Sequence, residues 1–399
     1  MIYLDYASTT YCDERVLDAM HPYWNVMFGN PHSRSHKFGW ESENAIEVAR
    51  KQIANLINVN ADEIIFTSGA TESNNLAIKG FVNGPNYIKG KKILSVLTEH
   101  KCVIETVRSC ARDGILVEFL SVNNDGLIDL NELEKKLENC ALFSISYINN
   151  ETGVVQDIAK ISEICRKNKV FLHVDAAQAF GKIEIDARLV DMLSISGHKI
   201  YGPKGIGALF VSKKPTRVRL KELISGGGQE RGMRSGTLPT PLCVGLGKAA
   251  FIAKEEMHRD YEKFQKFHQM IVSQVVDSME ELYINGSVSN KIPNILNLSI
   301  PYVEGESMMM RMSEFALASG SACTSKSLEP SHVISSMHPE NKDLAHSSLR
   351  ISFGRKTTQE EIEKLIIALK KNIIELRELS PLWKMFKAGV DLSKIHWGH

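Results

Sequence analysis

The sequence predicts an α/β protein with a mostly parallel sheet in a large domain, followed by a smaller α+β domain. From about residue 40, amphipathic helical segments alternate with short apolar segments that have the length of strands. After about residue 280 this alternation gives way to a mixture of strands, helices and a loop rich in Gly and Ser. At 399 residues the chain is long enough for two or three domains of about 150 residues each.

The alternating part begins with a helix predicted over residues 41–57, where apolar side chains recur at helical spacing. The following segments predict strands at 63–68, 91–98, 141–148, 170–176, 191–196 and 206–211, and helices at 72–82 and 157–169. Because helical crossovers make successive strands parallel, we expect helices on both faces of one sheet.

The second part follows a glycine-rich loop at 224–241. A long charged amphipathic helix is predicted from about 241 to 280. The remaining elements are expected to be a strand at 293–300, a helix at 305–316, a strand at 348–354 and a helix at 358–379. We divide the chain into a large domain, residues 15–258, and a small domain, residues 1–14 with 259–399.

Charge and composition exclude two classes of partner. The 48 Lys and Arg residues against 47 Asp and Glu give a formal charge of +1, which argues against direct nucleic-acid binding. No apolar run approaches the ~20 residues of a membrane helix. The opening "MIYLDYASTT" lacks the features of an export leader. We expect a cytoplasmic protein if the source is bacterial, and a mitochondrion or mitochondrion-derived organelle if it is eukaryotic.

The seven cysteines form no CxxC pair and no zinc-type cluster with histidine. Their odd number fits a reducing compartment. Cys110, Cys140 and Cys165 lie in apolar helix or strand contexts, which predicts small core side chains. Cys323 lies in a different context.

Lys199 has unusual neighbours for a lysine. It lies in "SGHKIYGPKGIG", residues 196–207, between a histidine and glycines that permit tight turns and close approach of a ligand. A half-buried amine can lose its proton near neutral pH and act as a nucleophile, because burial disfavours the charged form.

Four stretches together meet the requirements of pyridoxal phosphate: a lysine, an acid at the ring nitrogen, a phosphate cradle and a group covering the ring. In "FTSGATESNN", residues 66–75, Gly69 permits a sharp turn after a strand. Ala70 and Thr71 then present donors at a helix N-terminus, where anions bind. Taken alone, the stretch is equally well explained as a turn capped by Thr71.

The acid is Asp175, at the carboxyl end of a strand, where ligands of open α/β sheets collect. Its carboxylate would keep the pyridine nitrogen protonated, and the Gln178 amide could reach the phenolic oxygen of the ring. An aspartate in this position is more often a helix cap. Lys199, at the end of the next strand, favours the cofactor interpretation.

His100 and Asn150 also follow strands. An imidazole at the first position could stack on the cofactor ring and move protons, although a single histidine is more often structural. The Asn150 amide could reach a substrate carboxylate or an oxygen of the cofactor.

Eight ordered motifs resemble the cysteine desulfurases of the class V aminotransferase group over essentially the whole chain. They are "TSGATESNN", "TEHK", "NNETGVVQDI", "HVDAAQ", "SGHKIYGPKGIG", "GGGQERGMRSGT", "SGSACTS" and "HSSLRISFGR". The segment "SPLWKMFKAGVDL" is similar to the tail of the housekeeping iron–sulfur-cluster type. The resemblance implies a type I pyridoxal-phosphate fold with a seven-stranded sheet, a homodimer, and conversion of L-cysteine to L-alanine with the sulfur left on the enzyme.

The resemblance also assigns roles to matching residues. Lys199 would be the Schiff-base lysine, His100 the acid/base group on the ring, and Asp175 the partner of the pyridine nitrogen. The other contacts would be Gln178 at the phenolic oxygen, Ala70, Thr71, Ser196 and His198 at the phosphate, Thr237 at the phosphate of the other subunit, and Arg350 with Asn150 at the substrate carboxylate.

Cys323 lies in "LASGSACTSKSLEPS", residues 317–331, a stretch of small residues from which we expect a mobile loop. The resemblance implies that its thiolate attacks the substrate sulfur and carries the persulfide to an iron–sulfur scaffold protein or another sulfur acceptor. It also implies that Cys323 can be a transient iron–sulfur ligand. By composition alone, a free surface cysteine is the alternative. The region after about 375 is expected to bind the scaffold.

Three other functions remain open at this point. A selenocysteine lyase or a plain transaminase could use the same fold and cofactor. Cys323 argues against the transaminase, and relative rates on cysteine and selenocysteine would distinguish the lyase. A protein of another class, a docking platform without turnover, would have no need of Lys199, Asp175, His100 and Cys323 together.

Overall fold

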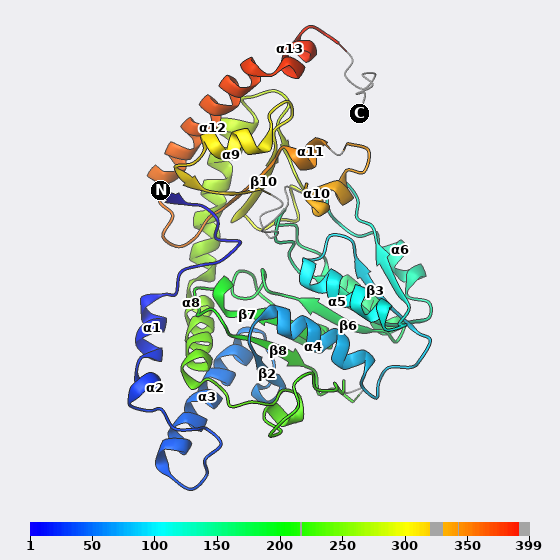
Figure 1. Cartoon of the computed structure of the whole chain (residues 1–399), viewed down its shortest axis with the longest axis vertical. Helices are drawn as coiled ribbons and strands as arrows, with labels where there is room; N and C mark the ends of the chain where they lie inside the picture. The colour runs from blue at the N-terminus through cyan, green and yellow to red at the C-terminus, as the bar shows by residue number, and fades with distance from the viewer. Residues whose placement is uncertain (216–217, 320–329, 342, 391–399) are drawn as a thin grey trace.

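The strands between residues 64 and 211 form one seven-stranded sheet in the order β2-β8-β7-β6-β5-β3-β4 (Figure 1). Their bounds are β2 Ile64–Thr67, β3 Lys92–Val96, β4 Val117–Leu120, β5 Cys140–Ser146, β6 Phe171–Asp175, β7 Met192–Ser196 and β8 Gly207–Val211. All neighbours are parallel except the two pairs that include β8, which runs against both β2 and β7. The predicted mostly parallel sheet is confirmed in this computed structural model.

The structure describes residues 1–215, 218–319, 330–341 and 343–390. Cys323 and the last nine residues, 391–399, lie outside these ranges. Within the described residues, no helix is both long enough and apolar enough to span a membrane. The same residues contain no group of three or more His, Cys, Asp or Glu side chains arranged to hold a metal ion.

Helices cover both faces of the sheet. Alternation along β2 sends Ile65 to the face covered by α4 and α5, whereas Ile64 and Phe66 pack with α3 and α8 on the other face. Both faces are therefore dry, as a parallel sheet requires. The helices of this part are α1 Glu14–Met20, α2 Pro22–Asn25, α3 Lys37–Leu56, α4 Ala70–Val82, α5 Lys101–Arg112, α6 Leu130–Lys136, α7 Ile158–Lys167 and α8 Thr240–Ile271.

The second part of the chain forms a smaller antiparallel sheet in the order β12-β13-β10-β9. A separate parallel pair joins the N-terminal β1 to β11, so the start of the chain belongs to this part (Figure 1). The bounds are β1 Ile2–Tyr3, β9 Tyr283–Ile284, β10 Ile295–Ser299, β11 Phe315–Ala316, β12 Ala318–Ser319, β13 Ser348–Ser352, α9 Gly305–Arg311, α10 His332–Met337, α11 Asp343–His346, α12 Gln359–Leu379 and α13 Pro381–Lys387.

Helix α8 contributes to two separate apolar cores. Leu246 and Ile252 pack in the core of the large sheet, whereas Phe264 and Ile271 pack in the core formed with β10, β13 and α12. The change between the two cores falls between Ala253 and Phe264, and the domain boundary at residue 258 stays a prediction. Ile295, at the start of β10, nevertheless packs with the first core, so the two parts share a border region.

The long helix ends earlier than the sequence predicts. Regular α-helix stops at Ile271, and a π-helical segment follows at Val272–Val276. This segment contains three valines, whose branched side chains fit poorly in a helix interior. The sequence analysis also missed α5 and the edge strand β4, whose residues Val117, Glu118 and Phe119 are only partly buried and so give a weak strand pattern.

Glu230 shows why the motif "GGGQERGMRSGT" has its charged residues. Its carboxylate, 7% exposed, accepts two hydrogen bonds from the Arg50 guanidinium at 2.8 and 2.9 Å and one from the Phe66 backbone N–H at 2.6 Å. Such a bidentate pair holds its two elements in one orientation. The glycine-rich loop is therefore anchored on α3 and β2.

Candidate active site

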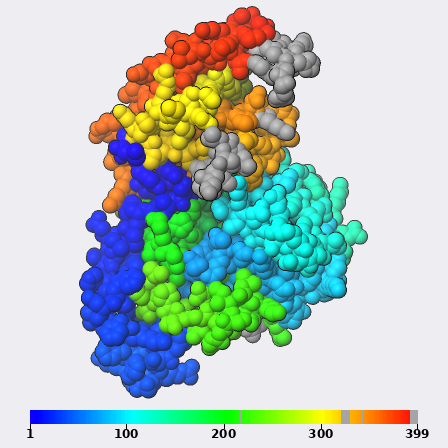
Figure 2. All heavy atoms as spheres, viewed as in Figure 1, coloured from blue at the N-terminus to red at the C-terminus, as the bar shows by residue number. Residues whose placement is uncertain are grey.

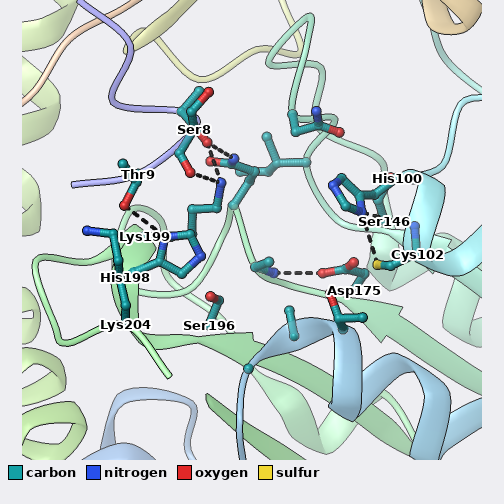
Figure 3. Close-up of a pocket in the computed structure, with 18 of the residues that line it drawn as sticks. Ser8, Thr9, His100, Cys102, Ser146, Asp175, Ser196, His198, Lys199 and Lys204 are labelled. Atoms are coloured by element: carbon teal, nitrogen blue, oxygen red, sulfur yellow. Dashed lines mark hydrogen bonds between the residues drawn. The ribbon is translucent and has the colours of Figure 1, made fainter. Parts of the chain in front are cut away.

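A cavity of about 550 Å³ opens where β2, β3, β5, β6 and β7 end (Figure 3). Ten of the predicted site residues line it: Ala70, Thr71, His100, Asn150, Asp175, Gln178, Ser196, His198, Lys199 and Arg350. Thr237 is exposed and does not line the cavity. Cys323, the remaining predicted position, lies outside the described residues.

Lys199 enters the cavity from a 3₁₀ turn at Gly197–Lys199 that follows β7 directly. Its side chain is partly buried, and Nζ donates hydrogen bonds to the carbonyl oxygens of Ala7 and Ser8 at 2.5 and 2.7 Å. The N-terminal segment thus supplies two hydrogen-bond acceptors for this amine (Figure 3). The residue pattern of "MIYLDYASTT" does not predict this contact.

Asp175 ends β6 and is 6% exposed. Each carboxylate oxygen accepts one hydrogen bond, Oδ1 from the Ala177 backbone N–H at 2.9 Å and Oδ2 from Asn74 Nδ2 at 2.7 Å. Both carboxylate oxygens therefore have a donor partner, and the orientation of the carboxylate is fixed. Asn74 is a site residue that the sequence analysis missed, although it lies inside a motif quoted there.

The turn between β2 and α4 requires glycine at Gly69, where φ is 151°. A side chain built at Gly207, at the start of β8, would come within 2.6 Å of the Gly69 Cα atom. The two glycines let the backbones of β8 and the turn approach closely. The first N–H groups of the 13-residue helix α4 then lie at the cavity, in an arrangement suited to an anion.

Gln178 and Lys182 form a second polar chain toward the N-terminal segment. Lys182 Nζ donates to Gln178 Oε1 at 2.6 Å, and Gln178 Nε2 donates to the Ala7 carbonyl at 2.7 Å. Burial, with the charges of Lys199 and Arg350, lowers the pKa of Lys182 to about 7. The Gln178 amide is therefore held with its nitrogen toward the segment that Lys199 also contacts.

Arg350, on β13, is 3% exposed and reaches the cavity from the smaller sheet. It donates to Asp5 Oδ1 at 2.8 Å, to Ser8 Oγ at 2.6 Å and to the Asn150 carbonyl at 3.0 Å. Its Nε has no hydrogen-bond partner among the described residues. The guanidinium is thus oriented by both parts of the chain, through three of its five N–H donors.

The neighbouring residues Asn149 and Asn150 have different structural roles. The Asn149 side chain is buried and holds the turn, accepting from the backbone of Glu151 and Thr152 and donating to the Thr98 carbonyl. Asn150 faces the cavity. Their order in the sequence does not reveal which of them is structural.

His198 and His100 are both held as neutral rings. Burial, with the nearby charges of Lys199 and Lys204, lowers the pKa of His198 to about 4, and its Nδ1 lies 3.0 Å from Thr9 Oγ1. Burial also lowers the pKa of His100, against the opposing charge of Asp175. The Cys102 thiol, 3.0 Å from His100 Nδ1, is a further cavity residue that the sequence analysis missed.

Glu99 is a buried carboxyl group beside this site. It is 1% exposed; Oε1 accepts from the Ser146 backbone N–H at 2.8 Å, and Oε2 has no partner among the described residues. Burial, with the charge of Asp175, raises the pKa of Glu99 to about 8. The folded protein therefore keeps this group protonated at neutral pH.

We expect Glu99→Gln to remove a pH-dependent loss of stability. Because the folded pKa lies above the unfolded value, wild-type stability should fall as the pH rises from about 4.5 to about 8 and then level off. At pH 9 the variant should be more stable than the wild type by of the order of 4 kcal/mol, and near pH 5 the two should be equal. Urea unfolding at both pH values measures this, with the exposed Glu105→Gln as control. Equal stabilities at pH 9 would contradict it.

The residues of the cavity fit pyridoxal phosphate. One enclosed space contains an amine, a carboxylate with donors on both oxygens, and a glycine turn at a helix N-terminus. A Cβ atom built on Gly69 meets nothing within 4 Å, so the turn borders open space where an anion has room. This donor set combines a nucleophile, an acid for a ring nitrogen and a phosphate cradle.

Comparison with known proteins agrees with this assignment. The family described as aminotransferase class V matches residues 2–365. The cysteine desulfurase IscS of Neisseria meningitidis serogroup A is 54% identical over 399 residues, covering 99% of this chain and 98% of that protein. The chain belongs to the cysteine desulfurases of the class V aminotransferase family.

One further relative and two solved structures are similar over most of this chain. IscS of Escherichia coli O139:H28 is 52% identical over 403 residues, with 100% of this chain and 99% of that protein covered. A solved NifS-like structure from Rickettsia africae gives a TM-score of 0.82 at 31% identity, covering 93% of this chain and 99% of that one. A structure titled SspA in complex with cysteine gives a TM-score of 0.77 at 35% identity, covering 88% of this chain and 99% of that one.

Proposed function

We propose that this desulfurase converts L-cysteine to L-alanine and leaves the sulfur on Cys323 as a persulfide. The observation that carries the proposal is the convergence of Lys199, Asp175 and Arg350 on one cavity from three separate strands or turns. In the net reaction the carbon–sulfur bond of cysteine breaks, a sulfur–sulfur bond forms at Cys323, and the thiol proton replaces sulfur on the β-carbon. No external oxidant or reductant is needed at this stage.

Pyridoxal phosphate, when bound, supplies an electron sink that lets bonds at the substrate α- and β-carbons break. We assign Lys199 to hold it covalently and to accept the α-proton at Nζ. Asp175 would keep a proton on the ring nitrogen, and Gln178 would donate to the phenolic oxygen. The phosphate would be held by the N-terminus of α4 with Ala70, Thr71, Ser196 and His198.

Arg350 and Asn150 would bind the substrate carboxylate. The planar guanidinium of Arg350, a residue that lines the cavity, suits a carboxylate. Asp5 and Ser8 accept hydrogen bonds from Nη2 of the same group, so its orientation is fixed by the protein itself. His100 would cover the cofactor and exchange a proton with the substrate.

The Cys323→Ser variant tests the proposal. It should retain the cofactor absorbance and its change on adding L-cysteine, while alanine formation falls by about a hundredfold or more because no thiolate can accept the sulfur. Mass spectrometry of the wild type should find one additional sulfur on the Cys323 peptide and none on the peptides of the six other cysteines. Continued sulfide release by the variant under limiting reductant would contradict the assignment.

We propose further that the protein is a homodimer whose interface includes the end formed by α2 and the start of α3 (Figure 1). Five large apolar side chains are exposed there, with exposed fractions between 48% and 66%: Trp24, Val26, Phe28, Phe38 and Trp40. The rings of Phe28 and Phe38 lie 5.5 Å apart and make one continuous surface. Such patches mark protein interfaces. Thr237 would then reach the phosphate of the other subunit.

The Phe28→Asp variant should weaken the dimer at least about tenfold, because a charge would be buried in the apolar patch. Sedimentation velocity at several concentrations measures this shift. Leu116→Asp, which changes an equally exposed apolar side chain outside the patch, is the matched control. A dimer of unchanged strength in the Phe28→Asp protein would place the interface elsewhere.

For the sulfur acceptor, we propose a scaffold protein that binds near the C-terminal region. A groove of about 760 Å³ lies between α13 and the loops around Tyr302, and four carboxylates line it: Glu281, Glu304, Glu340 and Asp343. Tyr302, Val303 and Leu344 also line it, so the groove combines apolar side chains with carboxylates. It would accept a basic segment of the partner. The IscS relatives named above are bacterial, and a bacterial source would place this protein in the cytoplasm. A eukaryotic source would place it in the mitochondrion or a mitochondrion-derived organelle.

A further inference from the structure

We propose that Asn74 and Cys102 are positioning residues that hold His100 in the tautomer with its proton on Nε2. Neither residue was assigned a role by the sequence motifs. The inference rests on the proposed function in one respect, that His100 is the acid/base group of this cavity. Asn74 and Cys102 would determine which ring nitrogen of His100 carries the proton and can donate to a ligand.

The chain of hydrogen bonds starts at Asp175. Asn74 is fully buried, and its Nδ2 donates one hydrogen to Asp175 Oδ2 at 2.7 Å and the other to Cys102 Sγ at 3.2 Å. A carboxylate can only accept, so the amide nitrogen must face it. The Asn74 Oδ1 atom has no partner among the described residues, which shows that the donors decide the orientation of this amide.

The Cys102 thiol links Asn74 to His100, because it accepts a hydrogen bond from one and can donate to the other. Since Sγ accepts a hydrogen from Asn74, its own hydrogen is left to be donated, and His100 Nδ1 lies 3.0 Å away. Burial raises the pKa of the Cys102 thiol to about 12, and the charge of Asp175 adds to this effect. The thiol therefore keeps its proton at physiological pH and acts as a donor rather than a nucleophile.

His100 Nδ1 also accepts the backbone N–H of Cys102 at 3.2 Å, as the N-cap of α5. Two donors directed at one nitrogen leave no room for a proton on it. The proton of the neutral ring must then be on Nε2, which makes no hydrogen bond with the described residues, and the ring lines the cavity (Figure 3). His100 thus presents an N–H donor to a bound ligand.

Other charged groups act on His100 without selecting a nitrogen. Asp175 raises the pKa of the imidazole, whereas burial and three positively charged or titratable neighbours lower it: Lys199, His332 and Arg350. The hydrogen bonds at Nδ1 differ from these effects because they oppose protonation at one atom only. Their loss should therefore change both the tautomer and the pKa of His100.

The experiment is nitrogen-15 NMR of histidine-labelled, cofactor-loaded protein between pH 6 and 9. His100 is assigned by the signals lost in His100→Gln. In the wild type, Nδ1 should be unprotonated and Nε2 protonated. In Cys102→Ala, part of the proton should move to Nδ1, and the pKa of His100 should rise by about half a unit or more. Cys102→Ser, which keeps a donor, should restore the wild-type signals, and Asn74→Ala should behave as Cys102→Ala does.

Cys110→Ala, a buried cysteine on the same helix outside the cavity, is the matched control and should leave the His100 signals unchanged. A proton on Nδ1 in the wild type would overturn the proposal, and so would a Cys102→Ala spectrum equal to that of the wild type. Circular dichroism melting shows that the variants are folded. Because the readout needs no turnover, an inactive wild type would contradict the proposed function and leave the tautomer result intact.

Discussion

The Lys199→Ala variant is expected to form alanine from L-cysteine at least about a thousandfold more slowly than the wild type. Lys199 lines the cavity, and its Nζ donates hydrogen bonds to the backbone carbonyls of residues 7 and 8. Replacing this side chain with a methyl group removes both the attachment point for the cofactor and the base that accepts the α-proton. The absorbance change that L-cysteine produces in the wild type should also disappear.

Lys213→Ala provides the control for this experiment. Lys213 forms an ion pair with Asp62 at the surface, away from the cavity, so its loss should change the rate less than twofold or so. Alanine is measured by amino-acid analysis after a fixed time, with the cofactor content of both proteins determined beforehand. A Lys199→Ala protein that still makes alanine at a tenth of the wild-type rate would exclude the assigned role of this lysine.

The Asp175→Ala variant should lose about a hundredfold to a thousandfold in rate and bind pyridoxal phosphate more weakly. Its carboxylate is the only negative charge that we assign to the cofactor ring, and it is held by Asn74 and the Ala177 backbone. Removing it leaves the ring nitrogen without a partner and frees the Asn74 amide. Since the residue ends a strand inside the core, the cost should appear in function more than in secondary structure.

Cofactor binding by the Asp175→Ala protein is measured by absorbance during titration with pyridoxal phosphate, and turnover by alanine formation. Asp186→Ala is the matched control, because that carboxylate caps a short surface turn and pairs with Arg188. Asp175→Asn separates charge from hydrogen bonding: it should retain binding better than rate. Wild-type turnover in Asp175→Ala would remove this residue from the site.

Much of the candidate site could be predicted because parallel strands bring their carboxyl ends to one edge of a sheet. Thr67, Ser146, Asp175 and Ser196 each end a strand of that sheet, so residues next to them meet at the cavity although they are far apart in the sequence. The apolar runs defined the strands, and the polar residue after each run marked the edge. Lys199 and Asp175 could be placed together on this ground alone.

Other parts could not be predicted, because they depend on contacts between distant segments. The N-terminal residues lie against both parts of the molecule (Figure 2), where Ala7 receives hydrogen bonds from Gln178 and Lys199. No local pattern in "MIYLDYASTT" indicates those partners. Likewise, Asn149 and Asn150 are adjacent and chemically identical, and only packing makes one a turn residue and the other a cavity residue.

By itself, the sequence of this protein determined the helix and strand alternation, the strand ends and the residue types available for chemistry, since these follow from local hydrophobic periodicity and turn preferences. The tertiary structure alone decided how those residues are held: Arg350 by Asp5 and Ser8, Glu230 by Arg50, and His100 by Cys102 and Asn74. The physical reason is that a hydrogen bond needs two groups at about 3 Å, and the distance between residues 74 and 175 or 5 and 350 is set by packing rather than by the order of the chain.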